Sequence, residues 1–210
     1  MSSYLSNWAL LVLASLGASA VPGISFALVV RNTLAASKRQ IGILTAAGLS
    51  VGMLIYALII CFGLDAFLSH RIHEVLKYAG AVYLGYIGLK SIFQNKPLSS
   101  EENLLNACTK HKINVLSAFS MGFVTNILNP KVMIFFIALF SQFINDNTPL
   151  SVSLTYAFTS VFIEFLWFSG LSILITHSSF LETIKNASRY IEIAMGIIFI
   201  ILSVSVFINP

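Results

Sequence analysis

Charge is what this sequence has least of. Lys, Arg, Asp and Glu make up only 10% of the 210 residues, whereas 57% are hydrophobic. A soluble globular domain is about 25% charged and about 45–50% apolar. The mean hydropathy of +0.88 therefore excludes a chain with an ordinary water-exposed surface. We expect an all-α membrane protein, because about 20 mostly apolar residues form a helix that crosses about 30 Å of hydrocarbon.

Residues that usually carry catalysis, cofactors or crosslinks are also scarce. The two cysteines, Cys61 and Cys108, are too few for a disulfide framework or a metal cluster, and we expect both to be free thiols. No nucleophile elbow, phosphate-binding glycine loop or zinc motif occurs, so the sequence predicts neither an enzyme nor a cofactor. The net charge of +4 comes from residues that flank apolar runs and gives no reason to expect a nucleic-acid partner. The four histidines fall in the expected connections without metal-ligand spacing: His70, His73, His111 and His177.

Six apolar runs, bounded by charged residues, divide the chain. They cover residues 4–30, 41–64, 75–93, 113–143, 150–175 and 191–208. The only extended polar stretch, 94–112, lies between the third and fourth runs. It predicts a cytoplasmic linker between two three-helix repeats, residues 1–93 and 113–210.

Lys and Arg indicate how these segments are oriented. They concentrate in the first, third and fifth connections: Arg31, Lys38 and Arg39; Lys96, Lys110 and Lys112; Lys185 and Arg189. Because cytoplasmic loops carry an excess of Lys and Arg, these connections are expected in the cytoplasm and both termini outside. The alternative is a re-entrant first segment, which would reverse only the N-terminus.

One proline interrupts the first segment of each half, in the sequences Pro22-Gly23 and Asn129-Pro130. Pro22 and Pro130 stand 108 positions apart, and Gly88 and Gly196 share that spacing. The two matches indicate a duplicated three-span unit. A unit with an odd number of spans enters the membrane from the opposite side in its second copy. The sequence therefore predicts the inverted repeats of many secondary transporters.

The helix breaks also predict a binding site. Proline removes a helical hydrogen bond, and discontinuous helices in such transporters present their broken ends to the substrate. We therefore expect substrate-binding residues at Pro22, Gly23, Asn126, Asn129 and Pro130. Asn129 is equally suited to cap the second half-helix. The alternative is that both breaks are ordinary proline kinks.

Two ionisable residues lie deep in apolar runs, Lys131 in the fourth and Glu164 in the fifth. Such groups cost several kcal/mol inside a membrane and indicate function. We expect Lys131 and Glu164 to face each other, with Lys131 as charge partner or carboxylate anchor and Glu164 as the proton-coupling acid. A static ion pair that joins two helices is the alternative. Tyr56 stands 108 positions before Glu164. It either binds substrate in the same cavity as Glu164 or only packs.

Glycines spaced along the second and third segments predict close contacts between helices. They are Gly48, Gly52, Gly80, Gly85 and Gly88.

Several of these motifs resemble the LysE/RhtB family of amino-acid exporters over nearly the whole chain. They include Pro22-Gly23, Gly42 after a basic turn, and the run from Lys77 to Gly88, which is similar to K-x-a-G-a-x-Y-L-x-x-x-G. The most specific motif is Gly122-Phe-Val-Thr-Asn-Ile-Leu-Asn-Pro-Lys131. It is followed by Phe135-Phe136 and Gln142-Phe143, and Glu164 stands where many members place an acidic residue.

The resemblance implies proton-driven efflux of amino acids or similar small zwitterions across the bacterial cytoplasmic membrane. The expected partners are the lipid bilayer, a small amino-acid-like substrate and protons. One departure is Ile24, where the family usually has a second proline, which implies a less rigid half-helix. A cation or metal exporter using Glu164 and the asparagines is an alternative, although one deep carboxylate suits a divalent ion poorly. A membrane enzyme or a structural subunit is another alternative function. The sequence leaves open which substrate is transported and whether the chain forms a homo-oligomer.

Overall fold

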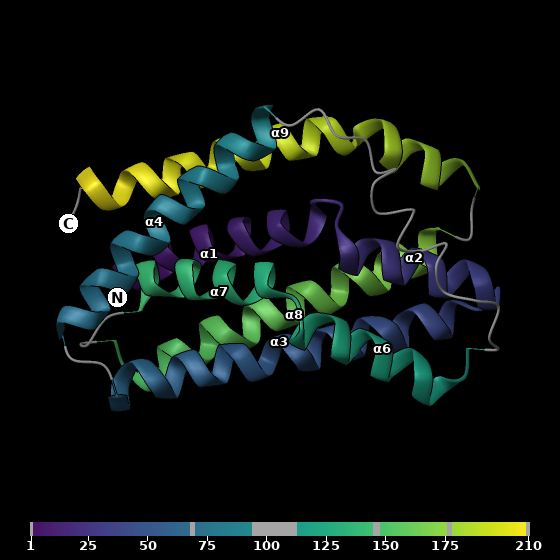
Figure 1. Ribbon diagram of the computed structural model, residues 1–210, viewed down its shortest axis with the longest axis horizontal. Coiled ribbons are helices and arrows are strands. Elements are labelled where there is room, and N and C mark those ends of the chain that lie inside the picture. Colours follow the sequence, from purple (N-terminus) through teal and green to yellow (C-terminus); the bar gives the residue numbers. More distant parts are fainter. Residues whose placement is uncertain (1, 68–69, 94–112, 145–147, 176–177, 209–210) are drawn as a thin grey trace.

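The computed structural model describes residues 2–67, 70–93, 113–144, 148–175 and 178–208. These residues form eight helices and no strand, as the apolar composition predicted. They are α1 (Ser2–Ala20), α2 (Ile24–Ala36), α3 (Arg39–Phe67), α4 (His70–Phe93), α6 (Val115–Ile127), α7 (Pro130–Phe143), α8 (Leu150–Leu174) and α9 (Ser178–Ile208). The helices run along the long axis of the molecule, and α1 begins at the end of the bundle at which α9 ends (Figure 1).

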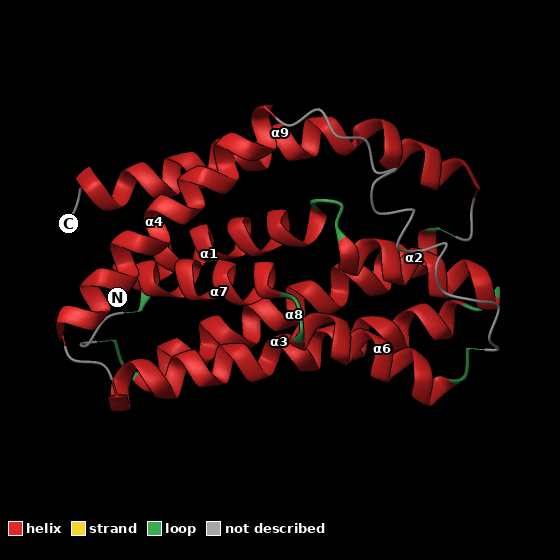
Figure 2. Cartoon of the chain, viewed as in Figure 1, coloured by secondary structure: helices red, strands yellow, loops and turns green. Residues whose placement is uncertain are grey.

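The first segment of each half is a bent pair of helices, as its proline predicted. α1 and α2 meet at 56°, and α6 and α7 meet at 60°. Figure 2 shows both breaks as short loops near the middle of the bundle. Pro130 is the first residue of α7, a position where its missing N–H removes no intrahelical bond.

Helices α4 and α9 begin earlier than the apolar runs predicted. α4 begins at His70 rather than near residue 75, and α9 at Ser178 rather than near 191. His70, His73, Lys185 and Arg189 therefore belong to helices, and their assignment to connections was wrong. The apolar runs begin only after these polar residues, but the helical hydrogen bonds include the polar residues as well. The described residues do not include the predicted linker, 94–112, which contains Cys108 and His111. They do not include His177 either.

The described helices provide fewer clear membrane spans than the six predicted. Three helical stretches are long and apolar enough to cross a membrane: Arg39–Phe62, Leu150–Leu174 and Arg189–Ile208. Counting each bent pair as one span gives up to five. α4 is long enough but less apolar, because glycines, tyrosines and lysines interrupt its apolar residues.

Glycines bring neighbouring helices into close contact, as the sequence predicted. A Cβ atom added at Gly48 of α3 would lie 2.8 Å from the backbone nitrogen of Phe123 in α6. A Cβ added at Gly80 of α4 would lie 2.7 Å from the Cα of Ala138 in α7. Real Cβ atoms almost never approach so closely, so these helices pack backbone to backbone through small residues.

The contact between α4 and α9 is reciprocal. A Cβ added at Gly88 would lie 2.6 Å from the carbonyl oxygen of Gly196 and 2.8 Å from Ile200 Cγ1. A Cβ added at Gly196 would lie 2.6 Å from the carbonyl oxygen of Gly88 and 2.8 Å from Ile92 Cγ1. Gly88 and Gly196, like Ile92 and Ile200, are 108 positions apart. Each side of this contact thus repeats the other, as in a two-fold interface.

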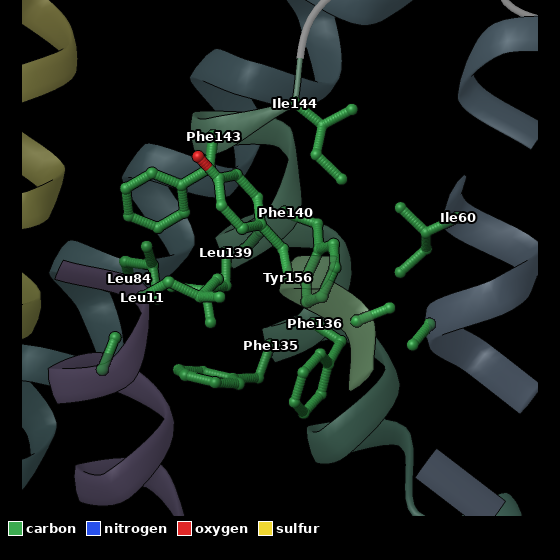
Figure 3. Packing of buried hydrophobic residues seen from close by; sticks show 14 of the residues in the cluster. Leu11, Ile60, Leu84, Phe135, Phe136, Leu139, Phe140, Phe143, Ile144 and Tyr156 are labelled. Atoms are coloured by element: carbon green, nitrogen blue, oxygen red, sulfur yellow. The ribbon is translucent and has the colours of Figure 1, made fainter. Parts of the chain in front are cut away.

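The largest core cluster fills the half of the bundle that contains α7. Phe135, Phe136, Phe140 and Phe143 of α7 pack with Tyr156 of α8 and with residues of α1, α3 and α4 (Figure 3). Lipid is about as apolar as these side chains, so van der Waals packing rather than exclusion from water stabilises the cluster. Beyond the two breaks, this half of the bundle is closed by aromatic side chains.

Candidate functional site

The second helix break is held by local hydrogen bonds. Asn129 is the N-cap of α7, and its Oδ1 accepts a hydrogen bond of 3.1 Å from the backbone N–H of Lys131. This confirms the capping role that the sequence offered for Asn129. Asn and Pro together therefore restart the helix at this position.

Tyr56 stabilises the carbonyl end of the same break. In an unbroken helix the Ile127 carbonyl would accept the N–H of Lys131 four residues later, but that N–H is bound by Asn129. The Tyr56 hydroxyl donates a hydrogen bond to the Ile127 carbonyl oxygen instead. Tyr56 is not among the residues that line the cavity described below. The structure thus places it beside the break as a hydrogen-bond donor.

The first break leaves the start of α2 without a side-chain cap. Its N-cap is Gly23, in an extended conformation with φ −157° and ψ −167°, and glycine has no side chain that could accept from the first-turn amides. Pro22 is buried beside it. Backbone N–H groups at a helix start have no intrahelical acceptor and attract negative charge. The first turn of α2 can therefore bind an anionic group.

Both breaks line one cavity of about 320 Å³. Gly23 to Phe26 line it from the first break, and Asn129 to Val132 from the second. Phe135, Phe136, Phe168 and Phe199 form much of the remaining wall, and the polar side chains include three serines of α1 and α2. The volume is in the range of small-molecule sites.

Glu164 is the buried carboxylate of this cavity. It lines the wall from α8 but is only 5% exposed. The side-chain amide of Asn126, which is fully buried in α6, donates to Glu164 Oε1 at 3.3 Å and to the Leu49 carbonyl oxygen at 2.6 Å. Within the described residues Asn126 Oδ1 has no hydrogen-bond partner. Asn126 therefore lies behind the carboxylate and positions it.

The expected pairing of Lys131 with Glu164 was wrong. Lys131 lines the cavity but is exposed, and no ion pair joins it to Glu164 in the part of the chain that the structure describes. Lys131 stands in the first turn of α7, where a side chain points back beyond the helix start. A long lysine can thus keep its ammonium in the more polar opening rather than bury it.

Sequence reasoning missed the polar contacts at this opening. Arg189 of α9 donates from Nη1 to the Ser91 carbonyl oxygen of α4 at 2.9 Å and lies 3.7 Å from Glu192 Oε2. Ser91 also lines the cavity. The three-residue spacing of Arg189 and Glu192 was a signal for an ion pair on one helix face. It went unused because Arg189 was assigned to a connection.

A metal centre has no support in the described residues, where no group of three His, Cys, Asp or Glu could hold an ion. Cys61 is a buried free thiol, as predicted, and its Sγ donates to the Ser153 carbonyl oxygen at 3.4 Å. The cavity therefore offers helix ends, an ammonium and a carboxylate rather than a metal site.

Comparisons with known proteins give a consistent result. A family model described as LysE type translocator matches residues 16–209. The membrane protein YrhP of Bacillus subtilis (strain 168), which its name describes as uncharacterized, is 29% identical over 188 residues. That alignment covers 87% of this chain and 88% of YrhP. The leucine efflux protein of Salmonella typhi is 24% identical over 186 residues, which cover 86% of this chain and 84% of that protein. No solved structure matches the chain significantly.

Proposed function

The chain belongs to the LysE type translocator family, as its motifs predicted, and on this premise we propose that it exports amino acids in exchange for protons. Membership makes it a multi-pass membrane transporter rather than an enzyme. The observation that carries the proposal is the shared cavity: both helix breaks and a buried carboxylate meet in it. Secondary transporters bind substrates where discontinuous helices meet.

The substrate is an amino acid whose two charged groups bind at different parts of the cavity. Its carboxylate binds the uncapped first turn of α2 and the Lys131 ammonium, both of which carry positive charge. Its ammonium binds Glu164. The phenyl groups of Phe135, Phe168 and their neighbours suit an aliphatic side chain. The leucine efflux relatives are in keeping with such a substrate.

Proton coupling follows from the burial of Glu164. An ionised carboxylate without a cationic partner is costly to bury, and its described hydrogen-bond partner, Asn126, is neutral. Glu164 is therefore occupied either by the substrate ammonium or by a proton, and not by both. This mutual exclusion makes a proton the counter-ion for each amino acid exported.

The proposed architecture is six spans in two inverted repeats, with α4 as the third span and α9 as the sixth. The reciprocal contact between Gly88 and Gly196 supports it, since residues 108 positions apart meet as they would across a two-fold axis. The connection between α2 and α3, which contains Lys38 and is followed by Arg39, lies at the opposite end of the bundle from the start of α1 (Figure 1). By the positive-inside rule that end is cytoplasmic, and both termini are outside. The aromatic cluster of α7 then closes the cavity toward the outside.

The experiment is transport by the purified chain in proteoliposomes. Radiolabelled leucine, valine, threonine and lysine are loaded inside or outside, with and without a pH gradient. We expect an aliphatic amino acid to move against its concentration when protons flow the opposite way. Liposomes with the protein but without flux of any amino acid in either condition would overturn the proposal.

A further inference from the structure

The inner end of α1 contributes a polar face to the cavity. Ser15, Ala18 and Ser19 stand at i, i+3 and i+4, positions that share one face of a helix, and all three line the cavity. Ser15 is only 2% exposed. The proposed function as stated above gives these residues no role, although they lie on the same cavity wall as the buried carboxylate.

The hydroxyl of Ser15 is left as an acceptor by its own hydrogen bond. Its Oγ donates to Oγ of Ser160 in α8 at 3.0 Å. A serine hydroxyl has one donor and two acceptor lone pairs, so only the lone pairs of Ser15 remain once its proton is bound by Ser160. Ser160 is fully buried and is not among the residues that line the cavity. Ser15 therefore offers the cavity an acceptor, which suits a cation and not a carboxylate.

Glu164 lies beside this acceptor. It follows Ser160 by four residues on α8, so their side chains are neighbours on one helix face, with Cβ atoms about 5–6 Å apart. Ser15 contacts Ser160 from α1, and both Ser15 and Glu164 line the cavity. A neutral acceptor and a carboxylate thus stand next to each other on one wall.

The last turn of α1 supplies a third acceptor. A helical carbonyl group accepts from the N–H four residues later, and the residue four positions after Ala18 is Pro22, which has no N–H. The Val21 N–H still donates to the Gly17 carbonyl oxygen at 3.0 Å, so the helical hydrogen bonds stop at this point. The Ala18 carbonyl group therefore has no donor from the usual helical position, and it belongs to the negative end of the helix.

We propose that Ser15 Oγ, the Ala18 carbonyl oxygen and the Glu164 carboxylate together bind the substrate ammonium and select primary amines. This inference rests on the proposed function, in which Glu164 binds that ammonium. A primary ammonium has three N–H donors, and the site offers one acceptor to each. An N-methyl group removes one donor and places a methyl group against an acceptor that it cannot satisfy. Ser160 is a positioning residue, because it acts only through the Ser15 hydroxyl.

N-methylation of the substrate tests this site in proteoliposomes. Wild type should transport leucine with a KM about tenfold below that for N-methylleucine, the effect of one hydrogen bond to a charged group. Ser15→Ala removes an acceptor and makes room for a methyl group. The KM for leucine should therefore rise about tenfold, while the KM for N-methylleucine stays the same or falls. A residue that only holds α1 against α8 would shift both KM values in the same direction.

Two further serine variants separate positioning from packing. Ser160→Ala keeps the Ser15 hydroxyl but releases its proton, so the KM for leucine should rise by only about threefold. Ser141→Ala is the matched control, because it removes a buried hydroxyl that donates to the Ala138 carbonyl oxygen. Ser141 stands 11 residues beyond the start of α7, or about 16 Å at about 1.5 Å per residue, and both of its KM values should match wild type.

Equal KM values of wild type for leucine and N-methylleucine would overturn the inference and leave the proposed function intact. Parallel shifts of both KM values in Ser15→Ala would do the same.

A second measurement does not depend on transport. Isoamylammonium is leucine without its carboxylate, and a ligand that binds only the folded protein raises the melting temperature. In detergent it should stabilise wild type more than its N,N,N-trimethyl analogue does. That difference should disappear in Ser15→Ala and Glu164→Gln but persist in Ser141→Ala. An equal effect of both amines on wild type, or no effect of either, would show that the cavity holds no site for a primary ammonium, whether or not amino acids are transported.

Discussion

The side-chain amide of Asn126 lies 3.3 Å from Oε1 of Glu164 and donates to it. A neutral amide is thus the described hydrogen-bond partner of the buried carboxylate. Asn126 can stabilise Glu164 in both its charged and its protonated form, because an amide offers a donor and an acceptor. Its oxygen, which has no partner in the described residues, is available to a protonated carboxyl.

Glu164→Gln should abolish gradient-driven flux and leave the fold intact. Glutamine keeps the shape and can accept the Asn126 hydrogen bond, but it can neither release a proton nor neutralise an ammonium. Proteoliposome transport with and without a pH gradient measures the coupling, and thermal unfolding in detergent checks the fold. Glu74→Gln is the control for loss of one acidic charge. Full coupling in Glu164→Gln would remove Glu164 from the mechanism.

Asn126→Leu should destabilise the protein through Glu164. The substitution is close in volume but leaves the buried carboxylate without its donor, which costs about 1–3 kcal/mol. In the Glu164→Leu background no charge remains to be satisfied, so the same change should cost much less. A double-mutant cycle on thermal or denaturant unfolding measures this difference as a coupling energy. Additive effects of the two substitutions would show that the contact contributes nothing.

Gly88→Ala should force α4 and α9 apart. The added methyl group would lie 2.6 Å from the carbonyl oxygen of Gly196, and overpacking of this kind costs about 1–3 kcal/mol. Gly196→Ala meets the same contact from the other side and should cost a similar amount. Gly170→Ala is the control, because nothing lies within 4 Å of a Cβ there. That change should be neutral or stabilise the helix by up to about 1 kcal/mol, and equal melting temperatures for all three variants would contradict the reciprocal packing.

The sequence predicted the features of this fold that arise from local chemistry. Proline acts on its own helix, so the breaks at Pro22 and Pro130 and the cap at Asn129 could be located from residue order alone. The ionic partner of Lys131 could not be predicted from residue order in this way. Whether an ammonium meets an acid depends on how the broken helix is placed against its neighbours, and on the preference of lysine for the more polar opening.

The role of Tyr56 and the extent of two helices were also beyond the sequence. A tyrosine 71 positions from Ile127 donates to its carbonyl group, and nothing in the local pattern of either residue indicates that contact. The polar first turns of α4 and α9 carry a helix past the limits of the apolar runs. The length of an apolar run reflects the thickness of the hydrocarbon layer, whereas the ends of a helix are set by caps and packing.

Lys131→Ala should weaken substrate binding and raise KM by about tenfold, the effect of losing one charge-assisted hydrogen bond of about 1.4 kcal/mol. Lys131→Arg keeps the charge and should retain much of the affinity. Lys77→Ala is the control, since it removes an equal charge from the early turns of α4. Concentration dependence of transport measures KM, and binding to the detergent-solubilised protein separates affinity from turnover. Unchanged affinity would leave Lys131 a structural residue.

Ile24→Pro should stabilise the first break while weakening the site. Ile24 is the first residue of α2, where proline fits the backbone. Gly23 before it is extended and so lies outside the α region that a following proline disfavours. The Ile24 side chain is 47% exposed, so little packing is lost. A lower chain entropy in the unfolded state should therefore raise stability by about 0.4–1 kcal/mol.

Proline also removes one of the N–H groups that we assign to the substrate carboxylate, so KM should rise in the same variant. Ile24→Ala loses the same cavity-lining side chain but keeps the N–H, so it separates the two effects: its stability should stay near wild type, and KM should rise further in Ile24→Pro than in Ile24→Ala. A stabilised Ile24→Pro variant with unchanged KM would place the carboxylate away from the start of α2.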